Sequence, residues 1–310
     1  MSNSTSNFKM YNYNPSTGAA ALFAVLFALT LIVLSVEVGI LNRSTKRRIS
    51  ASMDSRLKCS ESQDDGLTRK KVTSKYICLL VGCGMEMIGY IARAFSTKNQ
   101  DRILPFIIQS VFVLISPALF AASIYMIFGA MLTLLECSSL SIVPARYNTT
   151  FFVCGDIFSF LLQCGGGGLM AKSGTQNVGK ALAIVGLIIQ LVFFGFFLIT
   201  EVRFLILAPR RANLTSYFGN EWKIVNWTLI ASSILIFIRC VVRTAEFCEG
   251  QDGYLMSNEW IIYVFDSLLI IIAVWVFAVS MPFASLYDVN NTKIALNEFK
   301  ETSYENDNRC

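Results

Sequence analysis

Long apolar segments alternate with shorter polar ones along the chain. A helix needs about 20 mostly apolar residues to cross the hydrocarbon core of a bilayer, and seven segments reach that length. The pattern predicts an all-α, polytopic membrane protein with seven transmembrane helices. We place the spans at residues 19–41, 76–95, 104–135, 151–171, 178–200, 222–242 and 260–281, which together make a transmembrane bundle at 19–281.

Three of the spans have features that this pattern alone does not explain. The third is too long for one straight crossing and holds Pro117, so we expect it to kink there or to continue beyond the membrane. The fourth ends in four consecutive glycines at 165–168, which we interpret as a surface for close helix packing, with a hinge as the alternative. The first span is longer than a signal-peptide core and follows a single basic residue, Lys9, so we expect it to be retained.

The distribution of Lys and Arg predicts how the bundle is oriented. The loop at 42–75 alone carries ten of these residues, and the other loops on its side of the membrane carry most of the rest. Because basic loops stay in the cytosol, we expect an extracytoplasmic N-terminal tail at 1–18 and a cytosolic C-terminal tail at 282–310. With this orientation, Asn3 is the sequon that we expect to carry a glycan, which makes the chain a glycoprotein.

The basic loop at 42–75 has two interpretations. A solvated flank that stops translocation is sufficient to explain it. The alternative is contact with anionic cytoplasmic lipids, which contributes about 1 kcal/mol per basic side chain near the surface. Both interpretations place the loop against a membrane, so we do not expect nucleic acid as a partner.

The composition supports a membrane protein and excludes several kinds of chemistry. Hydrophobic residues make up 54% of the chain and charged residues 15%, whereas soluble domains carry about 25% charged residues. The chain has no histidine, the usual general base and a common zinc ligand, so histidine-lined membrane hydrolases are excluded. The nine cysteines form no CxxC pair and are interpreted as packing residues, with the pairing of Cys248 left open. We predict no catalytic residue, no metal and no cofactor.

Ionisable side chains inside the predicted spans are the candidate functional residues. Each costs roughly 2.5–3.5 kcal/mol at a helix centre on the insertion scale, so such residues face the bundle interior or water. Helical periodicity aligns them with other polar residues in stripes. The predicted substrate pathway consists of Glu86, Tyr90 and Arg93 in the second span, Asp156, Ser159 and Gln163 in the fourth, Arg239, Arg243 and Glu246 at the end of the sixth, and Glu259, Tyr263 and Asp266 in the seventh.

The helix directions also predict how deep these residues lie. From the outer boundary inwards, we expect first Arg93, Arg239, Arg243, Glu246 and Glu259, then Glu86 and Asp266, and finally Asp156 and Glu37. This order predicts a polar path from an outer charged vestibule into the bundle. Buried pairs that merely lock helix packing are the alternative. The sequence offers no obvious basic partner for Asp156, which favours the path.

Motifs in these stripes resemble the fungal RTA-like family of lipid-translocating exporters. The resemblance covers nearly the whole chain, from Tyr13 to about Pro282, although each motif alone is weak. Ser116 stands where alanine is commoner in the family, and the loop at 42–75 is long. The matching motifs are 86–93, Gln109 with 116–126, 155–156 with 159–168, Gly186 with Gln190, Arg239 with Arg243 and Glu246, and 253–254 with Glu259, Trp260, Tyr263 and Asp266.

The resemblance implies a multi-pass protein, in the plasma membrane in preference to a vacuolar or other internal membrane, that confers drug resistance and takes part in the response to toxic substances. It implies transport of a lipid-like or cationic amphiphile, such as a sphingoid base, a sterol analogue or a porphyrin, with membrane lipids as further partners.

A seven-helix receptor or sensor that regulates lipid or stress responses remains the alternative, although the Asp-Arg-Tyr and Asn-Pro-x-x-Tyr motifs of receptors are missing. We do not expect an enzyme, because the acids accompany no nucleophile or metal cluster. Without a Walker A motif, this chain itself would not use ATP.

Overall fold

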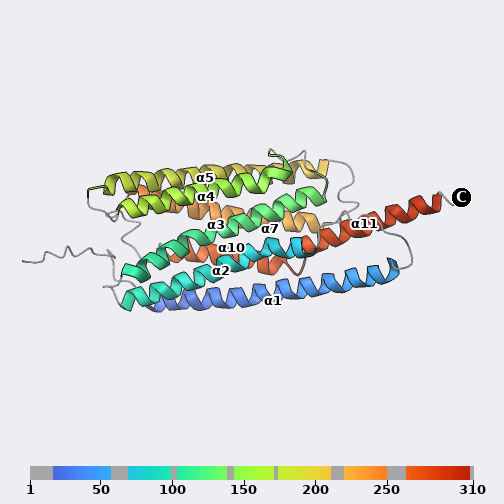
Figure 1. Ribbon diagram of the computed structural model, residues 1–310, viewed down its shortest axis with the longest axis horizontal. Coiled ribbons are helices and arrows are strands. Elements are labelled where there is room, and N and C mark those ends of the chain that lie inside the picture. Colours follow the sequence, from blue (N-terminus) through green and yellow to red (C-terminus); the bar gives the residue numbers. More distant parts are fainter. Residues whose placement is uncertain are drawn as a thin grey trace, which may run out of the picture.

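The computed structural model describes residues 17–56, 69–98, 103–137, 143–170, 174–210, 220–249 and 263–307, and every regular element in these ranges is a helix. Figure 1 shows an elongated bundle whose long helices run alternately in opposite directions. The elements are α1 (Thr17–Arg56), α2 (Arg69–Lys98), α3 (Ile103–Leu134), α4 (Ala145–Met170), α5 (Gln176–Leu207), η2 (Ala208–Arg210), α7 (Glu221–Glu249), the π-helical turn η3 (Tyr263–Leu268), α10 (Leu269–Ser280) and α11 (Leu286–Asp307).

Seven helices in the described ranges are long and apolar enough to cross a membrane, which confirms the predicted fold class. They are Thr17–Ser44, Lys71–Thr97, Ile107–Leu134, Tyr147–Met170, Gln176–Leu207, Glu221–Glu249 and Tyr263–Ser280. Helices that follow one another in sequence are neighbours in space, α7 joins α5 to α10, and α10 closes back on α1. We call the two ends of the bundle the Thr17 end, where α1 begins, and the α11 end, from which α11 extends (Figure 1).

Several helices are longer than their apolar segments. α1 continues to Arg56, well into the basic loop expected at 42–75, because residues 42–56 contain neither glycine nor proline to end it. α5 continues to Leu207 and α7 to Glu249. Polar residues that the sequence placed at or beyond the ends of spans are therefore held on rigid helices.

α3 runs as one helix from Ile103 to Leu134 with Pro117 in its interior. A proline has no N–H, so the carbonyl one turn earlier, that of Val113, loses its helical hydrogen bond. Arg239 on α7 donates to this carbonyl from a distance of 3.1 Å. A side chain of another helix thus satisfies the backbone group that the proline leaves without a donor.

The contact between α4 and α5 depends on glycine. A Cβ on Gly166 would lie 2.6 Å from the Gly179 carbonyl oxygen, and a Cβ on Gly179 would lie 2.6 Å from the Gly166 carbonyl oxygen. The same atom on Gly167 or Gly168 would meet nothing within 4 Å. α4 continues through all four glycines to Met170, and Gly166 provides the close helix packing expected of the run.

The α11 helix begins at a capped turn and is attached to α2. The Asp288 carboxylate accepts hydrogen bonds from the Ser285 backbone N–H at 2.9 Å and from the Ser285 hydroxyl at 2.7 Å, as in part of a capping box. The Tyr287 hydroxyl donates to Thr73 at 2.9 Å, and the Tyr287 ring stacks on Tyr76 at 5.8 Å. The part of the chain expected as a C-terminal tail therefore contains a helix docked on the bundle.

Farther along α11, Lys293 forms an ion pair with Glu136, the residue at the end of α3 with a positive φ of 56°. Lys293 is buried although it carries a charge. Thr292 donates to the Glu221 carboxylate at the start of α7 at 3.5 Å. α11 thus contacts α3 and α7 as well as α2, and it closes the bundle at this end.

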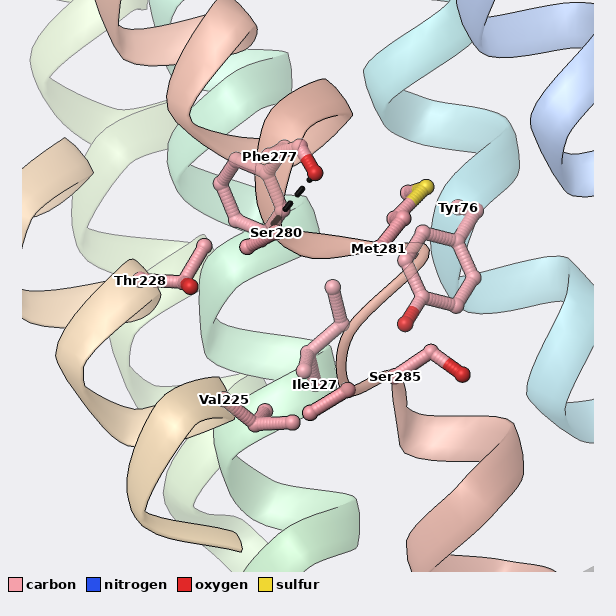
Figure 2. Close-up of a pocket in the computed structure, with 9 residues that line it drawn as sticks. Tyr76, Ile127, Val225, Thr228, Phe277, Ser280, Met281 and Ser285 are labelled. Atoms are coloured by element: carbon pink, nitrogen blue, oxygen red, sulfur yellow. Dashed lines mark hydrogen bonds between the residues drawn. The ribbon is translucent and has the colours of Figure 1, made fainter. Parts of the chain in front are cut away.

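Beneath the start of α11 lies a small cavity of about 10 Å³, roughly the least space that can take in one water molecule. Figure 2 shows side chains from several helices pointing into it, with the Tyr76 and Ser285 hydroxyls on one side. Its lining residues are Tyr76, Ile127, Val225, Thr228, Phe277, Ser280, Met281, Ala284 and Ser285. This cavity is too small to hold an amphiphile.

Candidate functional site: a charged cluster and a buried acid group

Most of the polar residues predicted as a pathway meet in the half of the bundle nearer the Thr17 end. α2 and α7 end there and η3 begins there, so residues from three separate stripes are brought together. We call this group the charged cluster; its members are Glu86, Tyr90, Arg93, Arg239, Arg243, Glu246, Tyr263 and Asp266.

Asp266 is the centre of the charged cluster. Its carboxylate lies 2.5 Å from the Arg239 guanidinium and 3.1 Å from that of Arg243. Arg243 also contacts Glu246 at 3.1 Å on its own helix. Asp266 and Arg239 are only 5% and 4% exposed, so the low-dielectric surroundings make each partner necessary to the other. Asp266 lies in the π-helical turn η3, a local geometry that is frequent at functional sites.

Aromatic hydroxyls extend the charged cluster to α2. The Tyr90 hydroxyl is hydrogen-bonded to Ser267, next to Asp266. Arg93 donates from its Nε to the Tyr263 hydroxyl at 3.1 Å, and its guanidinium lies 4.9 Å from the centre of the same ring. A cation over an aromatic face is attracted by the electrons of the ring. The second and seventh spans are thereby joined by specific polar contacts.

Two phenylalanines of α1 cover this polar junction. Phe23 stacks on Tyr263 with ring centres 5.2 Å apart, and Phe27 stacks on Tyr90 at 5.7 Å. Neither residue was among the predicted site residues, because in sequence each looks like any other apolar residue of the first span. Their positions make α1 a wall of the charged cluster.

Glu86 lies deeper on α2 than Tyr90 and is 1% exposed. It is close enough to Arg239 and Asp266 for an electrostatic interaction, yet its Oε2 atom has no hydrogen-bond partner. The arginines near Asp266 are already engaged by that acid. Glu86 therefore keeps a hydrogen-bonding capacity that the folded protein does not use.

A second polar group, which we call the buried acid group, consists of Tyr125 on α3, Asp156 on α4, Glu201 on α5 and Ser233 on α7. The Tyr125 hydroxyl faces Asp156 and the Ser233 hydroxyl faces Glu201, but without the geometry of a hydrogen bond. All four residues are at most 4% exposed. These acids lie in the apolar interior with hydroxyls as their nearest polar neighbours.

Aromatic rings surround the buried acid group. The Tyr125 ring lies 5.4 Å from that of Phe152, 6.0 Å from that of Phe194 and 4.4 Å from that of Phe197. Cys240 on α7 is in electrostatic range of both Asp156 and Asp266. The buried acid group and the charged cluster therefore adjoin each other along α7.

Sequence reasoning missed Glu201. The predicted fifth span ended at residue 200, one position before it, whereas α5 continues to Leu207 and buries Glu201 completely. The available signal was the apolar run that resumes at Phe204 and shows that the helix had not ended. Glu201 therefore joins Asp156 as an acid of the bundle interior.

Ser159 and Gln163 lie at the interface between α4 and α5. The Ser159 hydroxyl donates to the Gly155 carbonyl of its own helix at 2.8 Å. A Cβ on Gly186 would lie 2.8 Å from the Ser159 carbonyl oxygen. Gln163 donates from Nε2 to the Gln190 side-chain oxygen at 2.9 Å. Gln163 therefore joins α4 to α5 by a side-chain hydrogen bond, whereas Ser159 bonds within α4 and packs its backbone against Gly186.

The remaining predictions are only partly covered by the structure. Glu259 and Asn3 lie outside the described residues. Glu37 on α1 is half-buried, and its Oε2 atom has no hydrogen-bond partner. Cys248 is an exposed free thiol. Within the described ranges, no three His, Cys, Asp or Glu side chains are grouped so that they could hold a metal ion.

Comparison with known proteins places these features in context. A family model described as RTA1 like protein matches residues 79–288. Protoporphyrin uptake protein 1 of Saccharomyces cerevisiae is 42% identical over 294 residues, which are 93% of this chain and 97% of that protein. Protein RTM1 of Saccharomyces cerevisiae is 43% identical over 293 residues, or 92% of this chain and 95% of that protein.

A more distant relative is the sphingoid long-chain base transporter RSB1 of Saccharomyces cerevisiae, 26% identical over 234 residues, which are 61% of this chain and 59% of that protein. Two of these three relatives are named for uptake or transport, and none carries the name of an enzyme. No solved structure matches the chain.

Proposed function

Because the chain belongs to the RTA1-like family, as its motifs predict, we propose that it moves amphiphilic molecules across a membrane. The family includes proteins named for protoporphyrin uptake and for sphingoid long-chain base transport. Both names describe a molecule with an extended apolar part and ionisable groups. The cargo proposed here is such an amphiphile, with sphingoid bases, porphyrins and sterol analogues as the classes to test.

The observation that carries the proposal is the presence of deeply buried acids with unused hydrogen-bonding capacity. Glu86 and Asp156 are 1% and 4% exposed, and atoms of both carboxyl groups lack partners. Burying such groups without partners costs free energy, so acids that are kept there are candidates for a functional role. The ammonium group of a cationic amphiphile would supply the missing hydrogen bonds and charge, while its chain remains among the apolar side chains and lipid.

The ion pairs at the Thr17 end suggest other roles in the proposed path for the remaining predicted residues. Asp266 already contacts Arg239 and Arg243, so it supports the structure of the charged cluster and is a weaker candidate for direct contact with a cationic head group. In the proposed orientation this cluster lies at the extracytoplasmic boundary of the plasma membrane. Tyr90, Arg93, Glu246, Glu259 and Tyr263 would then form the charged entrance or exit of the path, with Ser159 and Gln163 lining the α4 side.

Transport in proteoliposomes tests the proposal. The purified protein would be reconstituted, and the movement of a fluorescent sphingoid base, a sterol analogue and protoporphyrin would be compared with movement in protein-free vesicles. We expect one class to move faster with the protein. Asp156→Asn and Glu86→Gln should abolish the difference, whereas Glu249→Gln, a change of an exposed acid on α7, should preserve it.

A cellular measurement complements the transport assay. Overexpression of the wild-type chain should confer resistance to toxic amphiphiles, and both Asp156→Asn and Glu86→Gln should lose it at equal membrane abundance. Full resistance in both variants would overturn the role of these acids. A protein that moves none of the three classes, but binds a cytosolic partner when a ligand is added, would be a receptor and would contradict the proposed function.

A further inference from the structure

Asp156 and Glu201 have no cationic partner in the part of the chain that the structure describes. Asp156 is 4% exposed and Glu201 is fully buried. All four of their carboxyl oxygens lack hydrogen-bond partners. Asp266, by contrast, is equally buried but is matched by two arginines. The fold therefore neutralises one of its buried acids with its own cations and leaves these two acids without them.

Two further polar groups point into the same region and are also unsatisfied. The hydroxyls of Tyr125 and Ser233 belong to fully buried residues and have no hydrogen-bond partner. Tyr125 faces Asp156 and is within electrostatic range of Glu201, and Ser233 faces Glu201. Four helices thus each direct a polar group with spare hydrogen-bonding capacity into one region of the bundle.

The other ionisable groups around this region do not neutralise the acids. Cys240 on α7 lies near Asp156 and Tyr125 and carries no positive charge. Arg239, one position earlier, is engaged by Asp266 and by the Val113 carbonyl. The polar neighbour from α3 is Tyr125, an uncharged phenol. No residue that the structure describes therefore supplies the positive charge that would match Asp156 and Glu201, which leaves a bound cation or a proton to supply it.

A proton and an organic ammonium are the cations that suit this region. An ionised carboxylate away from water costs several kcal/mol unless it is paired, so each acid is neutral or bound to a cation. A Ca²⁺ ion takes about six to eight oxygen ligands, whereas Asp156 and Glu201 each face a single hydroxyl. A proton needs only one carboxyl oxygen, and an organic ammonium, protonated or quaternary, pairs with a carboxylate through its charge and needs no further ligands.

We propose that Asp156 and Glu201 make the protein a proton–amine antiporter, in which a proton and the ammonium group of the amphiphile occupy the same buried carboxyl groups in turn. This inference rests on the proposed function and supplies its energy source. Each ammonium that binds displaces one proton from a carboxyl group, and the proton leaves towards the opposite side. One positive charge replaces another, so the exchange is electroneutral.

The test uses a probe that carries its charge permanently. An N,N,N-trimethylated sphingoid base cannot shed a proton and cross the bilayer as a neutral amine, so any proton movement that accompanies it comes from the protein. Proteoliposomes with a pH-sensitive dye inside would report lumenal pH while a fluorescent form of the probe reports uptake. Protein-free vesicles and an N-acylated, uncharged sphingoid provide the controls.

We expect the lumen of wild-type vesicles to become more alkaline as the trimethylated probe enters. An acidic lumen, lower in pH by about one unit, should drive about tenfold accumulation of the probe, because one-for-one exchange balances the two gradients. Asp156→Asn and Glu201→Gln should abolish both signals. Glu249→Gln should retain them, since its side chain is exposed on the same bundle.

The outcomes separate this inference from the proposed function. Protein-dependent uptake without any change of lumenal pH in wild-type vesicles would overturn the antiport and leave amphiphile transport intact. Absence of protein-dependent uptake for every amphiphile class would overturn both. The wild-type measurement decides between these outcomes even if a variant fails to fold, because collapsing the pH gradient with an ionophore should also abolish accumulation.

Discussion

The guanidinium of Arg239 donates a hydrogen bond of 3.1 Å to the carbonyl oxygen of Val113. Pro117 removes the helical donor of that carbonyl, and Arg239 replaces it from a different helix. The same side chain lies 2.5 Å from Asp266. A proline in the third span thus helps to hold the arginine that pairs with the acid of the seventh.

This arrangement predicts that the cost of losing Arg239 depends on Pro117. Arg239→Gln leaves Asp266 with Arg243 as its one remaining arginine and the Val113 carbonyl without a donor, and it should destabilise the protein by up to about 3–5 kcal/mol. In a Pro117→Ala background the alanine N–H can bond to the Val113 carbonyl, so the cost should fall by about 0.5–1.5 kcal/mol. Thermal or denaturant unfolding of the purified protein in detergent measures the two costs, and equal costs in both backgrounds would disprove the relationship.

The glycine run predicts opposite effects for neighbouring substitutions. Gly166→Ala places a methyl group against the α5 backbone and should destabilise the protein by about 1–3 kcal/mol. Gly167→Ala meets open space and should leave stability unchanged or raise it by up to about 1 kcal/mol, because alanine is the better helix former. Unfolding in detergent compares the two variants directly. Equal destabilisation by both would show that the α4–α5 contact is not the cause.

The attachment of α11 to the bundle can be tested by how strongly its backbone amides are protected from hydrogen exchange with solvent. Lys293→Ala removes the ion pair with Glu136, and Tyr287→Phe removes the hydrogen bond to Thr73, each worth about 1 kcal/mol. Both variants should speed amide hydrogen exchange in residues 286–296, measured by mass spectrometry. Ala295→Ser, on the exposed side of the helix, should not. Unchanged protection in all three would mean that other contacts hold α11 in place.

The proposed orientation predicts one glycan. The wild-type chain expressed in a eukaryotic cell should show a gel-mobility shift that a glycosidase removes. Asn3→Gln should abolish the shift, and Asn213→Gln, on the side predicted to be cytosolic, should not affect it. Loss of the shift in the Asn213 variant alone would place the N-terminus in the cytosol and reverse the bundle.

The sequence by itself was sufficient for the seven spans and for all eight residues of the charged cluster. Apolar length predicts a membrane helix because the bilayer imposes a thickness that each span must match. Glu86, Tyr90 and Arg93 could be found because helical periodicity places them on one face of α2. Arg243 and Glu246 could be found in the same way. These properties are local in the chain, so they can be read without knowing which helices touch.

Tertiary structure alone decided which groups are paired. Asp266 and Asp156 look alike in sequence, as single acids within apolar spans, yet Asp266 meets two arginines from α7 and Asp156 meets none. Glu201 was missed because the predicted fifth span stopped one residue short of it, although the apolar run that resumes at Phe204 signals that α5 continues. Hydrophobicity acts along the chain and sets the spans, whereas the pairing of buried charges depends on contacts between helices distant in sequence, and only the folded bundle determines those contacts.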